Sequence, residues 1–80
     1  MTLKNNIINV MDLFSGCGGL SYGFERAGYH IALGIDNDEM ALHTFKKNHS
    51  NSEVLHGDIT QITYENDIKG KIGDLPIDLI

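Results

Sequence analysis

Residues 7–19 of this 80-residue chain read I-I-N-V-M-D-L-F-S-G-C-G-G. An apolar run ends in a carboxylate, an aromatic ring and a small hydroxyl, and three glycines follow within four positions. A nearly continuous apolar run is typical of a strand that is covered on both faces of a parallel sheet. The glycines indicate a tight loop, because glycine accepts backbone conformations that other residues resist. We therefore expect a buried strand over residues 7–14, with a ligand-binding loop at its carboxyl end.

The composition indicates one small globular domain. Hydrophobic residues make up 41% of the chain, which has nine glycines, one proline and one cysteine. The single cysteine excludes an internal disulfide and is typical of the reducing cytoplasm, where we place the protein. No apolar run reaches the length of about 20 residues that a membrane helix needs, so we expect no membrane contact. The net charge of −5 argues against nucleic-acid binding by this chain alone, because phosphate contacts require Lys and Arg.

Helical and strand patterns alternate after the loop. Apolar or small residues at positions 20, 23, 24 and 27 predict one face of a helix, and Gly28 is well placed to end it. Residues 31–35 predict a second strand that ends at Asp36.

A second helix is expected to follow directly. Asn37 or Asp38 can cap its amino end. Its apolar side is expected to contain Met40, Ala41 and Phe45.

The last third of the chain is less regular. Residues 53–56 predict a short third strand, and residues 60–72 predict no more than one helical turn within a loop. Residues 76–80 predict the start of a fourth strand, which we expect to be cut by the end of the sequence. Strands that alternate with helices predict an α/β fold with a parallel sheet and right-handed crossovers.

Two carboxylates follow the second and third predicted strands. Asp36 lies twenty positions after Gly16, where a carboxylate can accept hydrogen bonds from two ribose hydroxyls. Asp58 comes after the third strand, where it can accept a hydrogen bond from the exocyclic amine of adenine. Free N–H groups at the start of the first helix can face an anionic group. Together these features predict a ligand that contains adenosine. Ser21 stands in place of the third glycine of the dinucleotide-binding pattern, which argues against NAD.

Three segments resemble motifs of one enzyme family. Residues 12–21, D-L-F-S-G-C-G-G-L-S, resemble the first motif of the cytosine-C5 DNA methyltransferases, which use S-adenosylmethionine. Residues 34–38, G-I-D-N-D, are similar to the second motif, and residues 57–59, G-D-I, are similar to the third. The resemblance implies the N-terminal part of a Rossmann-like, mostly parallel sheet of the S-adenosylmethionine-dependent methyltransferase type, truncated after the start of strand four. Residues 1–80 would then be a fragment: a partial S-adenosylmethionine-binding catalytic domain.

The resemblance also implies which residues contact the cofactor. Phe14 would pack against the adenine, and residues 15–19 would line the methionine part. Asp36 would hold the ribose hydroxyls, while Asp58 would contact the adenine amine and Ile59 would pack on the ring. The full set of expected cofactor-binding residues is Phe14, Ser15, Gly16, Cys17, Gly18, Gly19, Asp36, Asn37, Asp58 and Ile59.

The chemistry of the family depends on a thiolate in a Pro-Cys motif, which attacks C6 of a flipped-out cytosine so that C5 can take the methyl group. We expect this motif to follow the strand that begins at Pro76, beyond Ile80. None of the 80 residues is therefore expected to be catalytic, and the fragment alone is expected to be inactive. DNA is the expected partner of the full-length enzyme, and an unpaired sheet edge would favour self-association of the fragment.

Other functions and simpler structural roles stay open. A tRNA cytosine-5 methyltransferase, a stand-alone adenosine-binding module and an NAD-binding module each fit part of the pattern. Asp12 is expected either to hold the loop or to contact the ligand, and Asp36 could be a helix N-cap. Cys17 has no preceding proline, so we do not expect it to be a nucleophile. The histidines lack metal-ligand spacing, and solvated or helix-end positions are expected for His30, His43, His49 and His56.

Overall fold

The computed structural model describes residues 7–80. In chain order the elements are β1 (Asn9–Asp12), α1 (Gly19–Arg26), β2 (His30–Asp36), α2 (Glu39–Asn48), β3 (Glu53–His56), the π-helical segment η1 (Tyr64–Ile68) and α3 (Lys69–Ile72). The three strands are parallel and lie in the order β1-β2-β3. The predicted parallel α/β fold is therefore confirmed. No helix among the described residues is long and apolar enough to cross a membrane.

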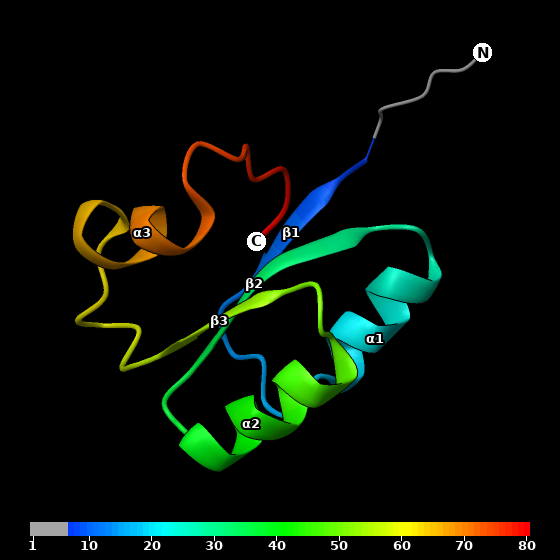
Figure 1. The fold of residues 1–80 in the computed structure, drawn as a ribbon, viewed down its shortest axis with the longest axis horizontal. Coiled ribbons are helices and arrows are strands. Elements are labelled where there is room, and N and C mark those ends of the chain that lie inside the picture. Colours follow the sequence, from blue (N-terminus) through cyan, green and yellow to red (C-terminus); the bar gives the residue numbers. More distant parts are fainter. Residues whose placement is uncertain (1–6) are drawn as a thin grey trace.

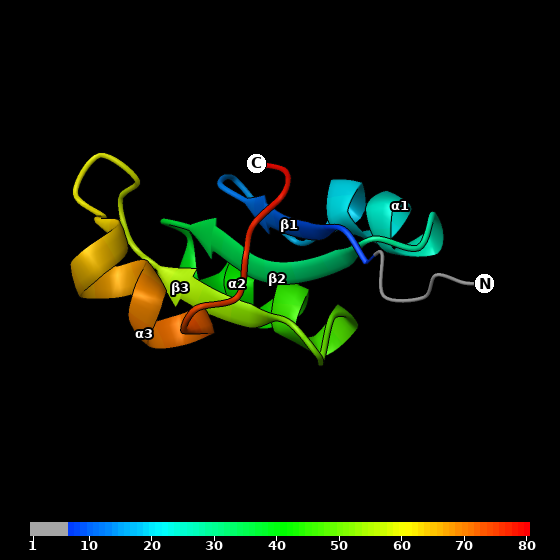
Figure 2. The same cartoon turned by 90° about the horizontal axis from the view of Figure 1, so that it is seen from above.

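Helices cover both faces of this sheet. The helices α1 and α2 lie on one face, and η1 and α3 lie on the other (Figures 1 and 2). Each face has its own core cluster, which explains why the central strand β2 is buried from Ile31 to Ile35. The cluster toward α3 contains Met11, Leu33, Ile35 and Ile68, and the cluster toward α1 and α2 contains Val10, Ile31 and Phe45.

A bulge in β2 explains how Ile31 and Leu33 reach opposite faces. Val10 pairs with Ile31, but Met11 pairs with Leu33, so Ala32 has no partner in β1. Residues two apart on a regular strand face the same side, and one extra residue breaks this alternation. The bulge therefore directs Ile31 toward the helix pair and Leu33 toward α3.

The end of α1 follows the prediction made for Gly28. Gly28 has a φ of 97°, and its N–H donates to the Glu25 carbonyl at 2.9 Å. The Tyr29 N–H donates to the Phe24 carbonyl at 3.1 Å, which completes a Schellman motif. The rings of Phe24 and Tyr29 stack with centroids 5.4 Å apart, the apolar contact that accompanies this motif.

The cap of α2 is confirmed, but its buried side was predicted only in part. Asp38 caps the helix through hydrogen bonds that its carboxylate accepts from the N–H groups of residues 40 and 41. Met40 was expected on the apolar side and is instead 76% exposed. Leu42 and Phe45 are the buried apolar residues. The reason is geometric: the outer end of the Phe45 ring packs against Gly34, and Leu42, one turn earlier, shares that face of the helix.

Two other segments differ from the prediction. The first strand ends at Asp12 rather than at residue 14, because the Asp12 carboxylate accepts a hydrogen bond from the Phe14 N–H and turns the chain. Residues 60–72 were expected to be mostly loop, yet residues 64–72 are helical throughout. Ile68 anchors this helical segment to the sheet because it is buried in the core.

The chain returns to β1 near residue 79. Leu79 pairs with Val10 in parallel, and its carbonyl accepts the Met11 N–H at 2.9 Å. The predicted fourth strand is thus present only as a single bridge. This bridge lies on the edge of β1 that faces away from β2, so strand order reverses at β1. Ligands of open α/β sheets bind at such a reversal, outside the carboxyl ends of the strands.

Candidate functional site

Five of the ten predicted site residues surround one hollow of about 100 Å³. It lies at the carboxyl ends of β2 and β3, beside the turn that follows β1. The predicted members are Phe14, Asp36, Asn37, Asp58 and Ile59, and the sequence-based prediction missed the neighbouring Leu13 and Gly57. Residues from three strand ends therefore meet at one place, as parallel pairing requires.

The other five predicted residues form the glycine loop. Gly16 and Gly18 have φ values of 54° and 99°, a region that favours glycine. The Ser15 N–H donates to the Ile35 carbonyl at 2.9 Å, and the Gly18 N–H donates to the Ser15 carbonyl at 3.0 Å. The loop is thus held against the end of β2. Cys17 is an exposed free thiol at its tip.

Asp36 connects this loop to the hollow. One of its carboxylate oxygens accepts the Gly16 N–H at 2.8 Å, and the other accepts the Asp38 N–H at 2.9 Å. Asp36 is therefore not the N-cap of α2, because Asp38 holds that place. Each carboxylate oxygen has two lone pairs, so Asp36 can still accept hydrogen bonds from a pair of hydroxyls.

Asp58 has an oxygen free for a ligand. Its Oδ1 accepts both the N–H and the hydroxyl of Thr60, at 2.9 and 2.8 Å. The backbone hydrogen bond from Thr60 and, second, its hydroxyl hold the pKa of Asp58 below its ordinary value. No residue in the range 7–80 donates to Oδ2. A charged acceptor therefore faces the hollow with one oxygen unused.

Two further features of the loop fit a bound group. The Ser15 hydroxyl is buried and has no hydrogen-bond partner within the described part of the chain. A buried hydroxyl without a partner is costly, so a ligand that supplies one would be favoured. At Gly19 an added Cβ would meet no atom within 4 Å, and its φ is not positive. Hence the fold itself does not require glycine at position 19.

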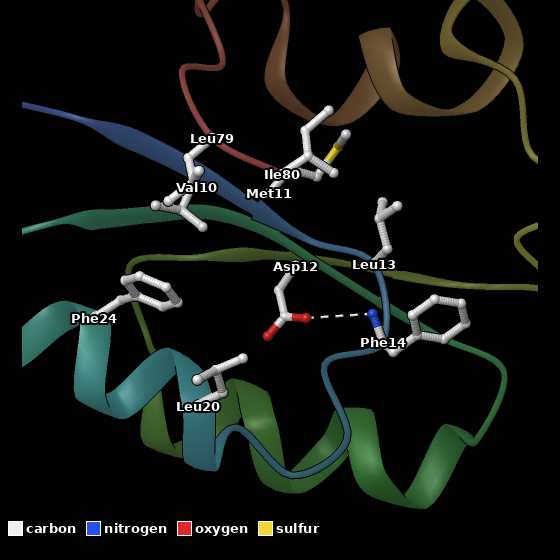
Figure 3. A pocket seen from close by; sticks show the side chains of 9 residues that line it. All are labelled: Val10, Met11, Asp12, Leu13, Phe14, Leu20, Phe24, Leu79 and Ile80. Carbon is white, nitrogen blue, oxygen red and sulfur yellow. Dashed lines mark hydrogen bonds between the residues drawn. The ribbon is translucent and has the colours of Figure 1, made fainter.

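A larger apolar hollow of about 420 Å³ lies on the opposite side of the turn. Figure 3 shows it between α1, which contributes Leu20 and Phe24, and the returning segment with Leu79 and Ile80. Its one carboxylate, Asp12, accepts the Phe14 N–H and the Ser21 hydroxyl at 3.2 and 2.8 Å. Asp12 therefore holds the loop, one of the two roles expected for it. The other side chains that line this hollow are apolar, so it offers fewer polar groups to a ligand than the smaller hollow does.

One histidine has the predicted helix-end position, but its burial was not predicted. His49 was expected to be solvated or at a helix end, and it does cap the carboxyl end of α2, but only 2% of it is exposed. It lies beneath Gly18 of the loop. The helical spacing of residues 42, 45 and 49 would have indicated its buried face. Within residues 7–80, no three His, Cys, Asp or Glu side chains gather as a metal site would require.

The family is decided by sequence comparison. The model of the C-5 cytosine-specific DNA methylase family matches residues 8–80. This chain belongs to that family. The type II methyltransferase M.NgoPII of Neisseria gonorrhoeae is 42% identical over 74 residues, which cover 89% of this chain and 22% of that protein. M.DdeI of Desulfomicrobium norvegicum is 41% identical over 68 residues, which cover 85% of this chain and 16% of M.DdeI.

Structural comparison of this DNA methylase family member agrees. A solved structure from E. coli, described as a DNA modification methyltransferase encoded within a prophage, superposes with a TM-score of 0.81 and 39% identity. The match covers 90% of this chain and 21% of that structure. The chain thus spans 16–22% of the length of these relatives, and its strands form the corresponding part of the methyltransferase sheet.

Proposed function

We propose that this chain is the S-adenosylmethionine-binding part of a DNA cytosine-5 methyltransferase. The observation that carries the proposal is the meeting of Phe14, Asp36 and Asp58 at one hollow beside the glycine loop. The aromatic ring of Phe14 suits an adenine ring. The Asp36 carboxylate, which is hydrogen-bonded to the loop, suits the hydroxyls of a ribose, and the free oxygen of Asp58 suits the exocyclic amine of adenine. The family membership supports the same cofactor and the same acceptor, cytosine in DNA.

Within this proposal each part of the site has a separate task. Phe14 is 75% exposed, so its ring is free to pack on the adenine. Asp36 accepts the ribose hydroxyls, and Oδ2 of Asp58 accepts the amine. The glycine loop receives the methionine part, with the Ser15 hydroxyl as a candidate partner for its polar atoms. When bound, S-adenosylmethionine supplies the methyl group as an electrophilic sulfonium.

In this proposal Cys17 is not the thiolate that attacks the cytosine. Cys17 is the one cysteine of the chain, and it follows Gly16 rather than a proline. It lies at the tip of the loop that we assign to the cofactor. We therefore assign cofactor binding to these 80 residues and propose methyl transfer for a protein of the relatives' length.

The sharpest test is a substitution that should change cofactor affinity without lowering the stability of the fold. Gly19→Ala adds a methyl group where the chain has space, so the unfolding free energy should stay the same or rise by about 0.5–1 kcal/mol. If the cofactor approaches this backbone, the same methyl group should weaken binding about tenfold or more, a loss of at least ~1.4 kcal/mol. Calorimetric titration with S-adenosylmethionine and urea unfolding measure the two quantities.

Gly23→Ala is the matched control, because it lies in the same helix with no atom near its added Cβ. It should leave cofactor affinity unchanged. Equal affinities for Gly19→Ala and the unchanged chain would contradict the placement of the cofactor. Tighter binding of NAD than of S-adenosylmethionine would contradict the cofactor itself.

A further inference from the structure

His49 is a buried polar residue that contacts the glycine loop from below. Its Nε2 lies 3.2 Å from the Gly18 carbonyl oxygen, and its Nδ1 lies 2.9 Å from Oε1 of Glu25. The ring also packs on Phe45, with centroids 4.5 Å apart. The contact to Gly18 spans 31 positions in the sequence, so it joins the end of α2 to the start of α1.

Both partners of the imidazole are acceptors, and this decides which form of the ring fits. A neutral imidazole has one N–H and can donate to only one of them, whereas an imidazolium donates to both. The side chain of His49 is fully buried and that of Glu25 is 33% exposed. A buried cation needs a paired charge, and Glu25 is the ion-pair partner that the described residues provide.

The contact fixes the orientation of one peptide group. The Gly18 carbonyl also accepts the Tyr22 N–H at 2.8 Å, so two donors hold it in place. None of the described peptides is cis, and the C=O and N–H of a trans peptide point in opposite directions. Because the Gly18 carbonyl points toward His49, the Gly19 N–H points away from it.

The same geometry leaves no room for a side chain at position 18. A Cβ on Gly18 would lie 2.7 Å from Nε2 of His49 and 3.0 Å from Cδ2 of Phe45. The glycine and the imidazole therefore fit each other closely. Any shift of the ring changes the support beneath the loop.

We infer that His49 and Glu25 are positioning residues: the ion pair of these side chains holds the Gly18–Gly19 peptide in the orientation that receives the cofactor. The inference rests on the proposed function, since it names the residues that act on the same loop from behind. Neither side chain lines the hollow where we place the adenosine.

The test uses the whole 80-residue chain with Glu25→Gln, His49→Phe and His49→Gln. Glu25→Gln keeps the shape and removes the charge, and Glu53→Gln is its control, an exposed carboxylate at the amino end of β3. His49→Phe keeps an aromatic ring without hydrogen bonds. His49→Gln restores an amide N–H that can reach the Gly18 carbonyl. Each variant is titrated with S-adenosylmethionine, unfolded in urea, and studied by NMR at the His49 ring nitrogens and at the Gly18 and Gly19 amides.

We expect the unchanged chain to show protons on both ring nitrogens. Glu25→Gln should shift the Gly18 and Gly19 amide signals and weaken cofactor binding roughly tenfold, the scale of one charged hydrogen bond. His49→Phe should weaken binding at least as much, and His49→Gln should recover part of the loss. Glu53→Gln should change neither the Gly18 and Gly19 amide signals nor the affinity for the cofactor. A role limited to stability would lower the urea midpoint without this rescue and without a change in affinity of the folded chain.

Two outcomes overturn the inference: a ring with one protonated nitrogen, or loop amide signals that Glu25→Gln leaves unmoved. If His49→Phe does not fold, Glu25→Gln decides. If the unchanged chain does not bind S-adenosylmethionine, the proposed function of these residues fails. The NMR signals of the ring and the two loop amides then still decide whether the ion pair orients the peptide.

Discussion

At the scale of single residues, Asp58 is the most direct reporter of the proposed ligand. Its Oδ1 is held by Thr60 and its Oδ2 is free. Asp58→Asn can keep the first interaction but replaces the free oxygen with an NH₂ group, which would face the adenine amine donor to donor. We expect cofactor affinity to fall about tenfold or more, on the scale of a lost charged hydrogen bond. Calorimetric titration measures this, and an unchanged affinity would remove Asp58 from the site.

Asp58 also gives the site a pH dependence with a definite sign. Hydrogen bonds from Thr60 lower its pKa, so the carboxylate stays ionised to lower pH than usual. The contribution of the ionised carboxylate to the stability of the fold is fully present above the pKa that Asp58 has in the unfolded chain. This contribution is lost as the pH falls through the lower pKa that Asp58 has in the folded chain. Thr60→Val removes the hydroxyl donor, so the pKa should rise and cofactor affinity should begin to fall at a higher pH.

An NMR titration of the Asp58 carboxyl carbon checks the predicted rise in pKa. Thr44→Val, an exposed position on α2, serves as the control and should leave the pKa in place. If Thr60→Val leaves the pKa of Asp58 unchanged, the hydrogen bond from the Thr60 hydroxyl does not stabilise the ionised carboxylate.

At the scale of elements, the seating of α2 on β2 depends on one glycine. A Cβ on Gly34 would lie 2.7 Å from Cζ of Phe45 and 2.8 Å from Cε1. Phe45 is fully buried, so its ring cannot swing aside. Gly34→Ala should therefore destabilise the chain by about 1–3 kcal/mol, the usual cost of overpacking. Urea unfolding measures the loss, with Gly70→Ala as a control in open space on α3. Equal stability of the two variants would show that α2 can shift without cost.

Local signals were sufficient for several elements and insufficient for others. Gly28, the Asp38 cap and the third strand over residues 53–56 were predictable, because each depends on residues close in sequence. The burial of Leu42 rather than Met40 was not, since both are apolar and the choice depends on where Phe45 meets Gly34. A similar long-range contact, with the sheet, makes Ile68 a core residue.

At the scale of the whole molecule, charge argues against DNA binding by this chain alone. The net charge is −5, with eleven acidic and six basic residues. Neutralisation of phosphates supplies most non-specific affinity, and an acidic chain repels the duplex. We expect no saturable binding to a cytosine-containing duplex at physiological salt, as measured by fluorescence anisotropy. Saturable binding that weakens as salt is raised would contradict this and would place part of the DNA contact within these residues.

The candidate site was also predictable in part at this scale. Phe14, Asp36 and Asp58 follow three strands, and parallel pairing alone brings strand ends together. The contact between His49 and the Gly18 carbonyl was not predictable, because it depends on how α1 and α2 pack against each other. Nor could the sequence indicate that Asp36 bonds the loop backbone, which requires the loop to fold over the end of β2.

The bridge between Leu79 and Val10 has a consequence for the newly made chain on the ribosome. The Asn9 N–H donates to the Asp78 carboxylate across 69 positions. β1 can pair with β2 once residue 36 has emerged, but its other edge stays unpaired until residue 79 follows. At about 5–20 residues per second, that delay is on the order of seconds. During this interval the outer edge of β1 is open to pairing with another nascent chain, so slower translation of residues 37–79 should increase co-translational aggregation.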